Sequence, residues 1–319
     1  MLANFGCACG EIGDIARKQD CLQRALAILE REFGPEHRRV APVLVFLGTS
    51  FGELGDAALK KDLLERSIAI LERAYGSRHC RLAPSLMELG CACLDLGDRV
   101  RARVLLERAL DIGETEYGVR HSHVAPTLMH LGCLLGELGD LSREKKLLER
   151  SVAIVEQNFG VDHRLVAAPL MYLGCAHGDL GDSVRQVEFL ERSLAIAERS
   201  YGTRHRFVVE PALLLGAALS SGGREGGRAK ELLQRVFSVS MQEFGPESHW
   251  PPSMRRAFAR SKLPLKMQRP GKPDFLEGTF ARDCKRLADE MESPWVSASE
   301  THQGQSVVRK RSEFHPADG

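Results

Sequence analysis

The 319-residue sequence lacks the long apolar runs of a membrane protein and any strong excess of charge. No stretch approaches the ~20 consecutive apolar residues that a membrane-spanning helix needs. Residues 1–20 do not have the basic start and apolar run of a secretory signal peptide. With 44 Lys+Arg against 43 Asp+Glu, the net charge is +1, which gives the whole chain no general preference for polyanions. We therefore expect a soluble, cytoplasmic protein.

Other features are also missing. The nine cysteines are an odd number, which argues against a disulfide framework and for free thiols in a reducing compartment. Period-two runs of β-branched residues are absent, so we expect essentially no sheet. The glycine-rich segment 222–227 has neither the preceding strand nor the Gly-Lys-Ser/Thr sequence of a phosphate loop. No catalytic combination of side chains can be placed. The sequence predicts no enzyme, no small-molecule substrate, no metal and no cofactor.

What the chain does contain is one segment repeated every 42 residues. Two glycine series keep this step: Gly6, Gly48, Gly90, Gly132, Gly174 and Gly216, and then Gly13, Gly55, Gly97, Gly139 and Gly181. Arg235 follows Arg192 by 43 residues, so the sixth unit has one extra residue, which we place in its glycine-rich turn. Self-similarity at a fixed period of this size predicts a solenoid, in which each unit buries apolar surface against its neighbours.

Each unit encodes two helices, as the third unit shows most clearly. One helical stripe is formed by Leu86, Leu89, Gly90, Cys93 and Leu96. Gly97 can adopt the left-handed conformation that ends a helix. Asp98 can cap the next helix, which we expect from about Arg99 to Glu116.

These residues resemble a known family. Leu86 to Gly90, Gly97-Asp98 and the small residue Ala109 resemble the tetratricopeptide repeat (TPR). The 42-residue spacing, the Leu-Glu-Arg-Ala/Ser-Leu/Ile segment and the Tyr-Gly-x-x-His-x-x-Val-Ala linker resemble the longer repeats of kinesin light chains and nephrocystin-like proteins. The resemblance implies an all-α fold, a right-handed TPR superhelix (α-solenoid) of about six helix-turn-helix repeats. It also implies a non-catalytic protein-protein interaction scaffold that binds peptides or helices in its concave groove.

The resemblance covers residues 1–249, and the rest of the chain differs in composition. We expect a capping helix at 250–263, then a mostly irregular C-terminal tail. Within 264–319 we expect a Pro-rich linker, an amphipathic helix at 275–292 and a disordered end. Residues 251–272 hold seven Lys+Arg and no acid, but without interleaved aromatics we favour a solubilising cap over nucleic-acid or membrane contact. As an alternative, the chain is a fragment of a larger multidomain regulatory, signalling or motor-adaptor protein, because it begins inside a first helix.

In a TPR superhelix the first helices line the concave face, so the stripe opposite the core stripe would point into the groove. The candidate partner-binding residues are Met87, Glu88, Cys91, Asp95, Met129, His130, Cys133, Glu137, Met171, Tyr172, Cys175 and Asp179. Asp95, Glu137 and Asp179 form an acidic row with Glu11 and Glu53 at the 42-residue step. This pattern indicates a soft apolar floor with an acidic rim, suited to a protein or peptide carrying apolar and basic groups. The alternative is that Met and Cys fill the interior and the acids cap or solvate turns.

Two further ladders follow the repeat. His37, His79, His121, His163 and His205 are 42 residues apart. A metal requires ligands that converge on one ion, whereas these histidines are a whole unit apart, so we expect linker packing and capping. The Glu-Arg pairs, such as Glu107-Arg108, predict a solvated or inter-repeat charge row. Cysteines at shared repeat positions are best read as small buried thiols.

Overall fold

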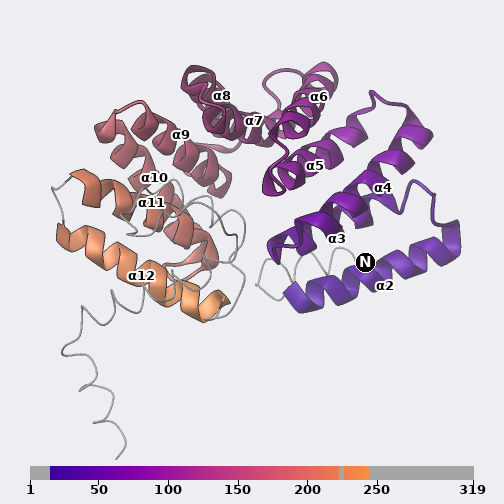
Figure 1. Cartoon of the computed structure of the whole chain (residues 1–319), viewed down its shortest axis with the longest axis horizontal. Coiled ribbons are helices and arrows are strands. Elements are labelled where there is room, and N and C mark those ends of the chain that lie inside the picture. The colour runs from indigo at the N-terminus through magenta and orange to yellow at the C-terminus, as the bar shows by residue number, and fades with distance from the viewer. Residues whose placement is uncertain (1–14, 223–225, 245–319) are drawn as a thin grey trace, which may run out of the picture. The chain divides into compact units, whose positions relative to one another are not determined.

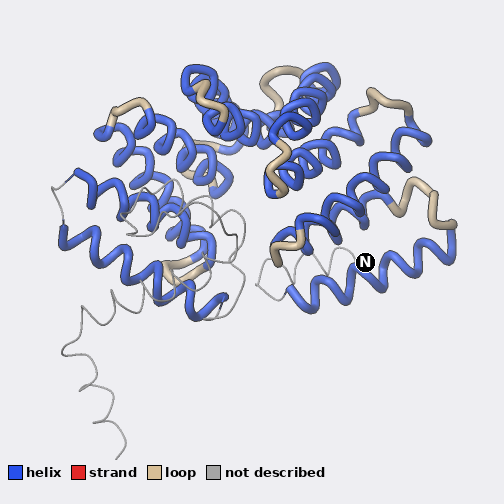
Figure 2. The backbone as a smooth tube through the Cα atoms, in the orientation of Figure 1, coloured by secondary structure: helices blue, strands red, loops and turns tan. Residues whose placement is uncertain are grey.

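The computed structural model describes residues 15–222 and 226–244. These residues form eleven α-helices and, within these ranges, no strand (Figure 2). The helices are α2 (Ile15–Phe33), α3 (Ala41–Glu53), α4 (Ala57–Tyr75), α5 (Ala83–Asp95), α6 (Arg99–Tyr117), α7 (Ala125–Glu137), α8 (Leu141–Phe159), α9 (Ala167–Asp179), α10 (Ser183–Tyr201), α11 (Arg206–Gly222) and α12 (Gly226–Phe244). The expected all-α fold is confirmed.

Helices pair within each unit and stack from unit to unit (Figure 1). The pairs are α3 with α4, α5 with α6, α7 with α8, α9 with α10, and α11 with α12. Short 3-10 turns lead into three of the pairs: η1 (Cys80–Leu82), η2 (Ser122–Val124) and η3 (Arg164–Val166). The first unit contributes α2, because its expected first helix falls within residues 1–14, outside the described residues.

The turns within a unit and between units follow the sequence pattern. Gly97 has φ +83° and Gly118 has φ +89°, a region that glycine enters without steric cost. The Asp98 carboxylate accepts a hydrogen bond from the Arg101 N–H at 3.0 Å and so caps α6. The expected α6 of Arg99–Glu116 differs from the observed helix by one residue.

The core lies between the paired helices and forms four apolar clusters along the described residues. Leu86, Leu106 and Ala109 are fully buried, and the same apolar cluster continues into α7 through Leu134. Gly90 lets the two helices of the unit approach, because a Cβ atom at residue 90 would lie 2.8 Å from Leu106 Cγ. The small residues of the repeat are therefore required by close helix packing.

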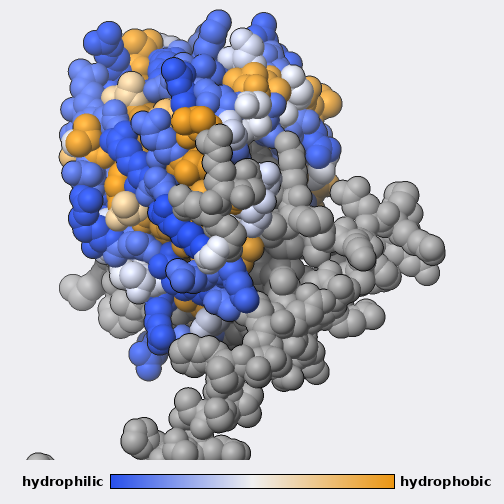
Figure 3. Space-filling model, turned by 90° about the vertical axis from the view of Figure 1, so that its left-hand side faces the viewer, coloured by the Kyte–Doolittle hydropathy of each residue, from blue (hydrophilic) through white to orange (hydrophobic). Residues whose placement is uncertain are grey.

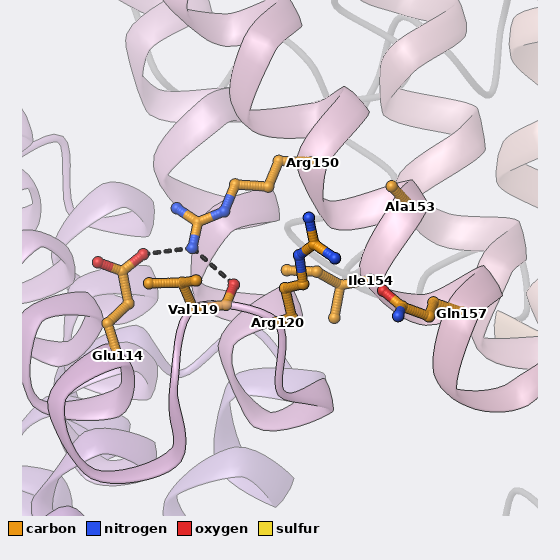
Figure 4. Close-up of a pocket in the computed structure, with 7 residues that line it drawn as sticks. All are labelled: Glu114, Val119, Arg120, Arg150, Ala153, Ile154 and Gln157. Carbon is orange, nitrogen blue, oxygen red and sulfur yellow. Dashed lines mark hydrogen bonds and ion pairs between the residues drawn. The ribbon is translucent and has the colours of Figure 1, made fainter.

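Arginines of the second helices tie neighbouring units together. Arg150 Nη2 of α8 lies 2.6 Å from Glu114 Oε1 of α6 and donates to the Val119 carbonyl at 2.7 Å, as Figure 4 shows. The same bridge is made by Arg66 with Glu30, Arg108 with Glu72, and Arg192 with Glu156. The Glu-Arg pattern is thus an inter-repeat row, in which each arginine holds the preceding unit.

The described surface is mostly hydrophilic on the face shown in Figure 3, with separate hydrophobic spots. No helix in the described part of the chain is long and apolar enough to cross a membrane. The expected capping helix at 250–263, the linker, the helix at 275–292 and the disordered end all lie outside the described residues, as does the extra residue of the sixth unit.

Candidate functional site

A groove of about 750 Å³ follows the first turns of four consecutive first helices. It is lined by Pro42, Val45 and Phe46 of α3, Pro84 and Met87 of α5, Pro126 and Met129 of α7, and Ala168 and Pro169 of α9. Because these positions recur every 42 residues, the groove is a property of the array rather than of one unit. We call this surface the apolar groove.

Its lining is predominantly hydrophobic. Phe46 is 40% exposed, although a buried position would suit an aromatic ring better. Met87 and Met129 are half-buried, and methionine side chains adapt readily to the shape of an apolar partner. The floor comes from the second helices, with Leu71 of α4, Gly113 of α6 and Val155 of α8. This arrangement can bury apolar side chains of another molecule.

The wall of the apolar groove is polar where the linkers meet it. The neighbouring Cys80 thiol, followed by burial, raises the pKa of the Tyr117 phenol. The Arg81 guanidinium lies over the Tyr75 ring, 5.1 Å from its centroid. Among the described residues, no carboxylate lies within ion-pair distance of Arg81, which lines the groove.

Of the residues that the sequence singled out, Met87 and Met129 line the groove. Met171, at the same repeat position, is only 4% exposed and belongs to the core, together with Cys175. Cys91 is also buried. For these three residues the alternative prediction, that Met and Cys fill the interior, describes what the structure shows.

The predicted acidic rim is already occupied by cations of the same chain. Glu88 Oε2 lies 2.7 Å from Lys60 Nζ, and Glu53 Oε1 lies 2.9 Å from Lys18 Nζ. Glu137 pairs with Arg99 at 3.3 Å. None of these three acids lines the groove, and five further candidates also lie outside its lining: Asp95, His130, Cys133, Tyr172 and Asp179.

The histidine ladder is structural. His121 Nδ1 accepts the His123 N–H at 3.2 Å, and its ring stacks on Tyr117 with 5.1 Å between centroids. The same cap and stack recur at His37, His79, His163 and His205. In the ranges that the structure covers, no group of three or more His, Cys, Asp or Glu could hold a metal.

Sequence reasoning missed several lining residues, namely Phe46, Cys80, Arg81, Tyr117 and His123. Phe46 shares the position of Glu88, His130 and Tyr172, so a side chain without any polar atom at a position that carries one in later units was the available signal. Arg81 and His123 come from linkers. Their approach to the groove depends on how the linker folds back, which periodicity does not report.

Comparison with known proteins agrees with this architecture. Residues 82–123 and 124–165 each match the tetratricopeptide repeat family, and no curated protein matches the chain. The stacked helical pairs with a groove along their first helices define a TPR solenoid, a fold of repeat scaffolds for protein interaction that are generally non-enzymatic. In fold, the array of 42-residue repeats is similar to solved kinesin light chain-like repeat proteins.

Three solved structures show this likeness. A candidate kinesin light chain of Podospora anserina with nearly identical TPR-like repeats is 24% identical, with TM-score 0.50, covering 65% of this chain and 97% of that one. BtubC (BKLC) from P. vanneervenii is 16% identical, with TM-score 0.56, covering 72% and 91%. A Rap protein complexed with competence and sporulation factor is 14% identical, with TM-score 0.61, covering 91% and 75%.

Proposed function

We propose that the protein is a non-catalytic scaffold that binds an extended or helical segment of another protein along the apolar groove. The observation that carries this proposal is the continuous hydrophobic lining over α3, α5, α7 and α9, with Phe46 40% exposed and Met87 and Met129 half-buried. A run of apolar side chains on a partner would bury this surface. The solved Rap protein, which is similar in fold, is complexed with competence and sporulation factor.

The charge of the partner follows from which charged side chains of the first helices and of the groove wall are already paired. Glu53, Glu88 and Glu137 each have a cation of this chain within ion-pair distance. Basic groups on the partner would therefore gain little from these acids. Arg81 has no described carboxylate partner, so we infer that apolar side chains followed by a carboxylate fit the groove better than the apolar and basic peptide expected from sequence.

The test is selection of peptides from a random library displayed on phage, followed by affinity measurement of the synthetic peptides by fluorescence anisotropy. The groove variant is Met87→Glu with Met129→Glu, because both side chains line the groove and neither is fully buried. We expect at least a tenfold loss of affinity, since two charges would enter the apolar contact. Met171→Glu is unsuitable because Met171 belongs to the core.

A matched control carries the same charges outside the groove. Val100→Glu with Val104→Glu changes two α6 side chains that are 79% and 60% exposed and line no part of the groove. Its peptide affinity should equal that of the wild type. If the groove variant folds and binds the peptides as tightly as this control, groove binding is wrong. A preference for basic over acidic peptides would contradict the role given to Arg81, but it would leave the proposal of groove binding intact.

A further inference from the structure

Residues of two linkers surround the aromatic ring that ends α4. His79 packs against the Tyr75 ring, with 4.7 Å between centroids. The guanidinium carbon of Arg81, in η1, lies 5.1 Å from the Tyr75 centroid, and that of Arg38, in the linker between α2 and α3, lies 5.7 Å from it. Two arginines from different linkers are therefore gathered at one tyrosine.

The fold does not require arginine at these two positions. Both positions recur at the 42-residue step beside the rings that end later second helices, where other side chains take them. The residues at the two positions are Cys80 and His123 for Tyr117, Ser122 and Leu165 for Phe159, and Arg164 and Phe207 for Tyr201. Of these four rings, Tyr75 alone has an arginine at both positions, so the arginine pair belongs to this place in the array and is not a general feature of the repeat.

The charges of Arg38 and Arg81 are not neutralised by the described part of the chain. Both side chains are exposed, and no carboxylate of the described residues lies within ion-pair distance of either one. Glu36, the acid closest to Arg38 in the chain, pairs with Arg73 instead. Two like charges at one ring without a counter-charge create a positive potential that attracts an anion.

The arginine pair adjoins the apolar groove. Arg81 lines the groove and Arg38 does not, so the pair lies at the groove margin. A segment bound along the groove passes Arg81, and an anionic side chain of that segment can therefore reach both arginines. This continuity favours a protein segment over a nucleic acid or a membrane surface as the source of the anion.

A phosphate group matches the arginine pair better than a carboxylate does. A phosphorylated side chain carries a charge of about −1.5 to −2 at pH 7 and has three acceptor oxygens. Guanidinium groups bind phosphate through paired hydrogen bonds, and clustered arginines are a common way to recognise phosphorylated segments. A carboxylate carries a single charge, so it would leave half of the positive charge uncompensated.

We propose that Arg38 and Arg81 form a binding site for a phosphorylated side chain of the partner. The phosphate accepts hydrogen bonds from both guanidinium groups, and the apolar residues beside it in the partner lie in the apolar groove. Phosphorylation of the partner therefore strengthens its binding. This inference rests on the proposed function of the groove and adds the class of partner, a phosphorylated protein segment.

The test compares each peptide selected for the groove in three forms, with phosphoserine, serine or glutamate at a position that is moved along the peptide. With the full chain, one phosphoserine position should raise the affinity by about tenfold or more over serine, and above glutamate. Arg38→Gln with Arg81→Gln should abolish this gain. The matched control, Arg120→Gln with Arg204→Gln, removes the same charge from two exposed linker arginines of later units and should keep the gain.

A second probe does not depend on the groove. N-acetylphosphoserine amide, which has no apolar side chain, should shift the side-chain Nε–H nuclear magnetic resonance signals of Arg38 and Arg81 and leave those of Arg120 and Arg204 in place. If this shift is present while no peptide binds, the phosphate site is supported and groove binding is wrong.

Three results would overturn the phosphate site. The first is an equal response of all four arginines to the amide. The second is a phosphoserine gain that survives Arg38→Gln with Arg81→Gln, or no gain over glutamate at any position. The third is binding of anionic phospholipid vesicles that is lost in the same variant, without any phosphoserine gain, because it would assign the arginines to a membrane surface.

Discussion

A Cβ atom at residue 52 would lie 2.6 Å from Lys60 Cδ, so Gly52 of α3 is the residue that makes room for Lys60 of α4. The same match of small with large recurs with Gly136 beside Glu144 and Gly178 beside Gln186. In the third unit the sizes are reversed, with Leu94 in α5 and Ala102 in α6. The two positions are therefore filled in a coordinated way in each unit.

We predict that Gly52→Ala lowers the free energy of unfolding by about 1–3 kcal/mol, because the added methyl overpacks a buried side chain. The triple variant Gly52→Leu, Lys60→Ala and Glu88→His installs the arrangement of the third unit, where His130 takes the position of Glu88, and should lie closer to the wild type than Gly52→Ala does. Guanidinium unfolding followed by circular dichroism measures both. If the triple variant is less stable than Gly52→Ala, the positions do not compensate each other.

Glu88 was expected to meet a partner but instead neutralises buried Lys60, whose side chain is 9% exposed. We predict that Glu88→Gln costs about 3 kcal/mol of folding free energy, since it leaves a buried ammonium without its counter-charge. Glu65→Gln, which removes an exposed partner of Arg101, is the matched control and should cost less than ~1 kcal/mol. Comparable losses in thermal unfolding would show that Lys60 is better solvated than its burial indicates.

Lys60 also gives a pH dependence. Its burial lowers the pKa, but the Glu88 carboxylate and then Cys91 raise it more, so the net pKa lies above the ordinary lysine value. A folded-state pKa above the unfolded one stabilises the fold below pH ~10.4, and this contribution is lost as pH rises through the folded value. The stability of the wild type relative to Lys60→Met should be constant up to about pH 10 and should fall as the pH rises further. A constant difference would refute this prediction.

Arg150 should be important because it holds both a carboxylate and a carbonyl of the preceding unit (Figure 4). We predict that Arg150→Ala lowers the free energy of unfolding by about 1–2 kcal/mol. Arg150→Lys should restore only part of this loss, because the single nitrogen Nη2 meets both acceptors and the shorter, flexible lysine stem holds an ammonium less firmly at that point. Arg103→Ala removes only an exposed pair with Glu107 within α6 and should change stability by less than ~0.5 kcal/mol. Equal effects in urea unfolding would argue against the inter-repeat bridge.

His121 should act as a helix cap and not as a ligand. His121→Ala removes both the acceptor for the His123 N–H and the stack on Tyr117, and we expect a loss of about 1–2 kcal/mol. His121→Asn keeps an acceptor and should recover part of the loss. Amide hydrogen exchange at residue 123 reports the cap directly. Exchange that is unchanged in the alanine variant would mean that the cap contributes nothing.

The sequence by itself determined the helices, their caps and their order. The period of 42 residues, the stripe containing Leu86 and the Gly97-Asp98 turn depend on local backbone preferences and on one helical face, both of which sequence spacing reports directly. The observed bounds of α5 and α6 follow that pattern closely.

Only the tertiary structure decided which repeat positions are available to a partner. Met87 and Met171 are the same residue type at the same position, yet Met87 lines the groove and Met171 is 4% exposed. Glu88 likewise forms an ion pair with Lys60, which lies 28 positions earlier in the chain, on the neighbouring helix. Exposure and pairing depend on side chains that other units contribute, and a periodic pattern within one unit carries no information about them.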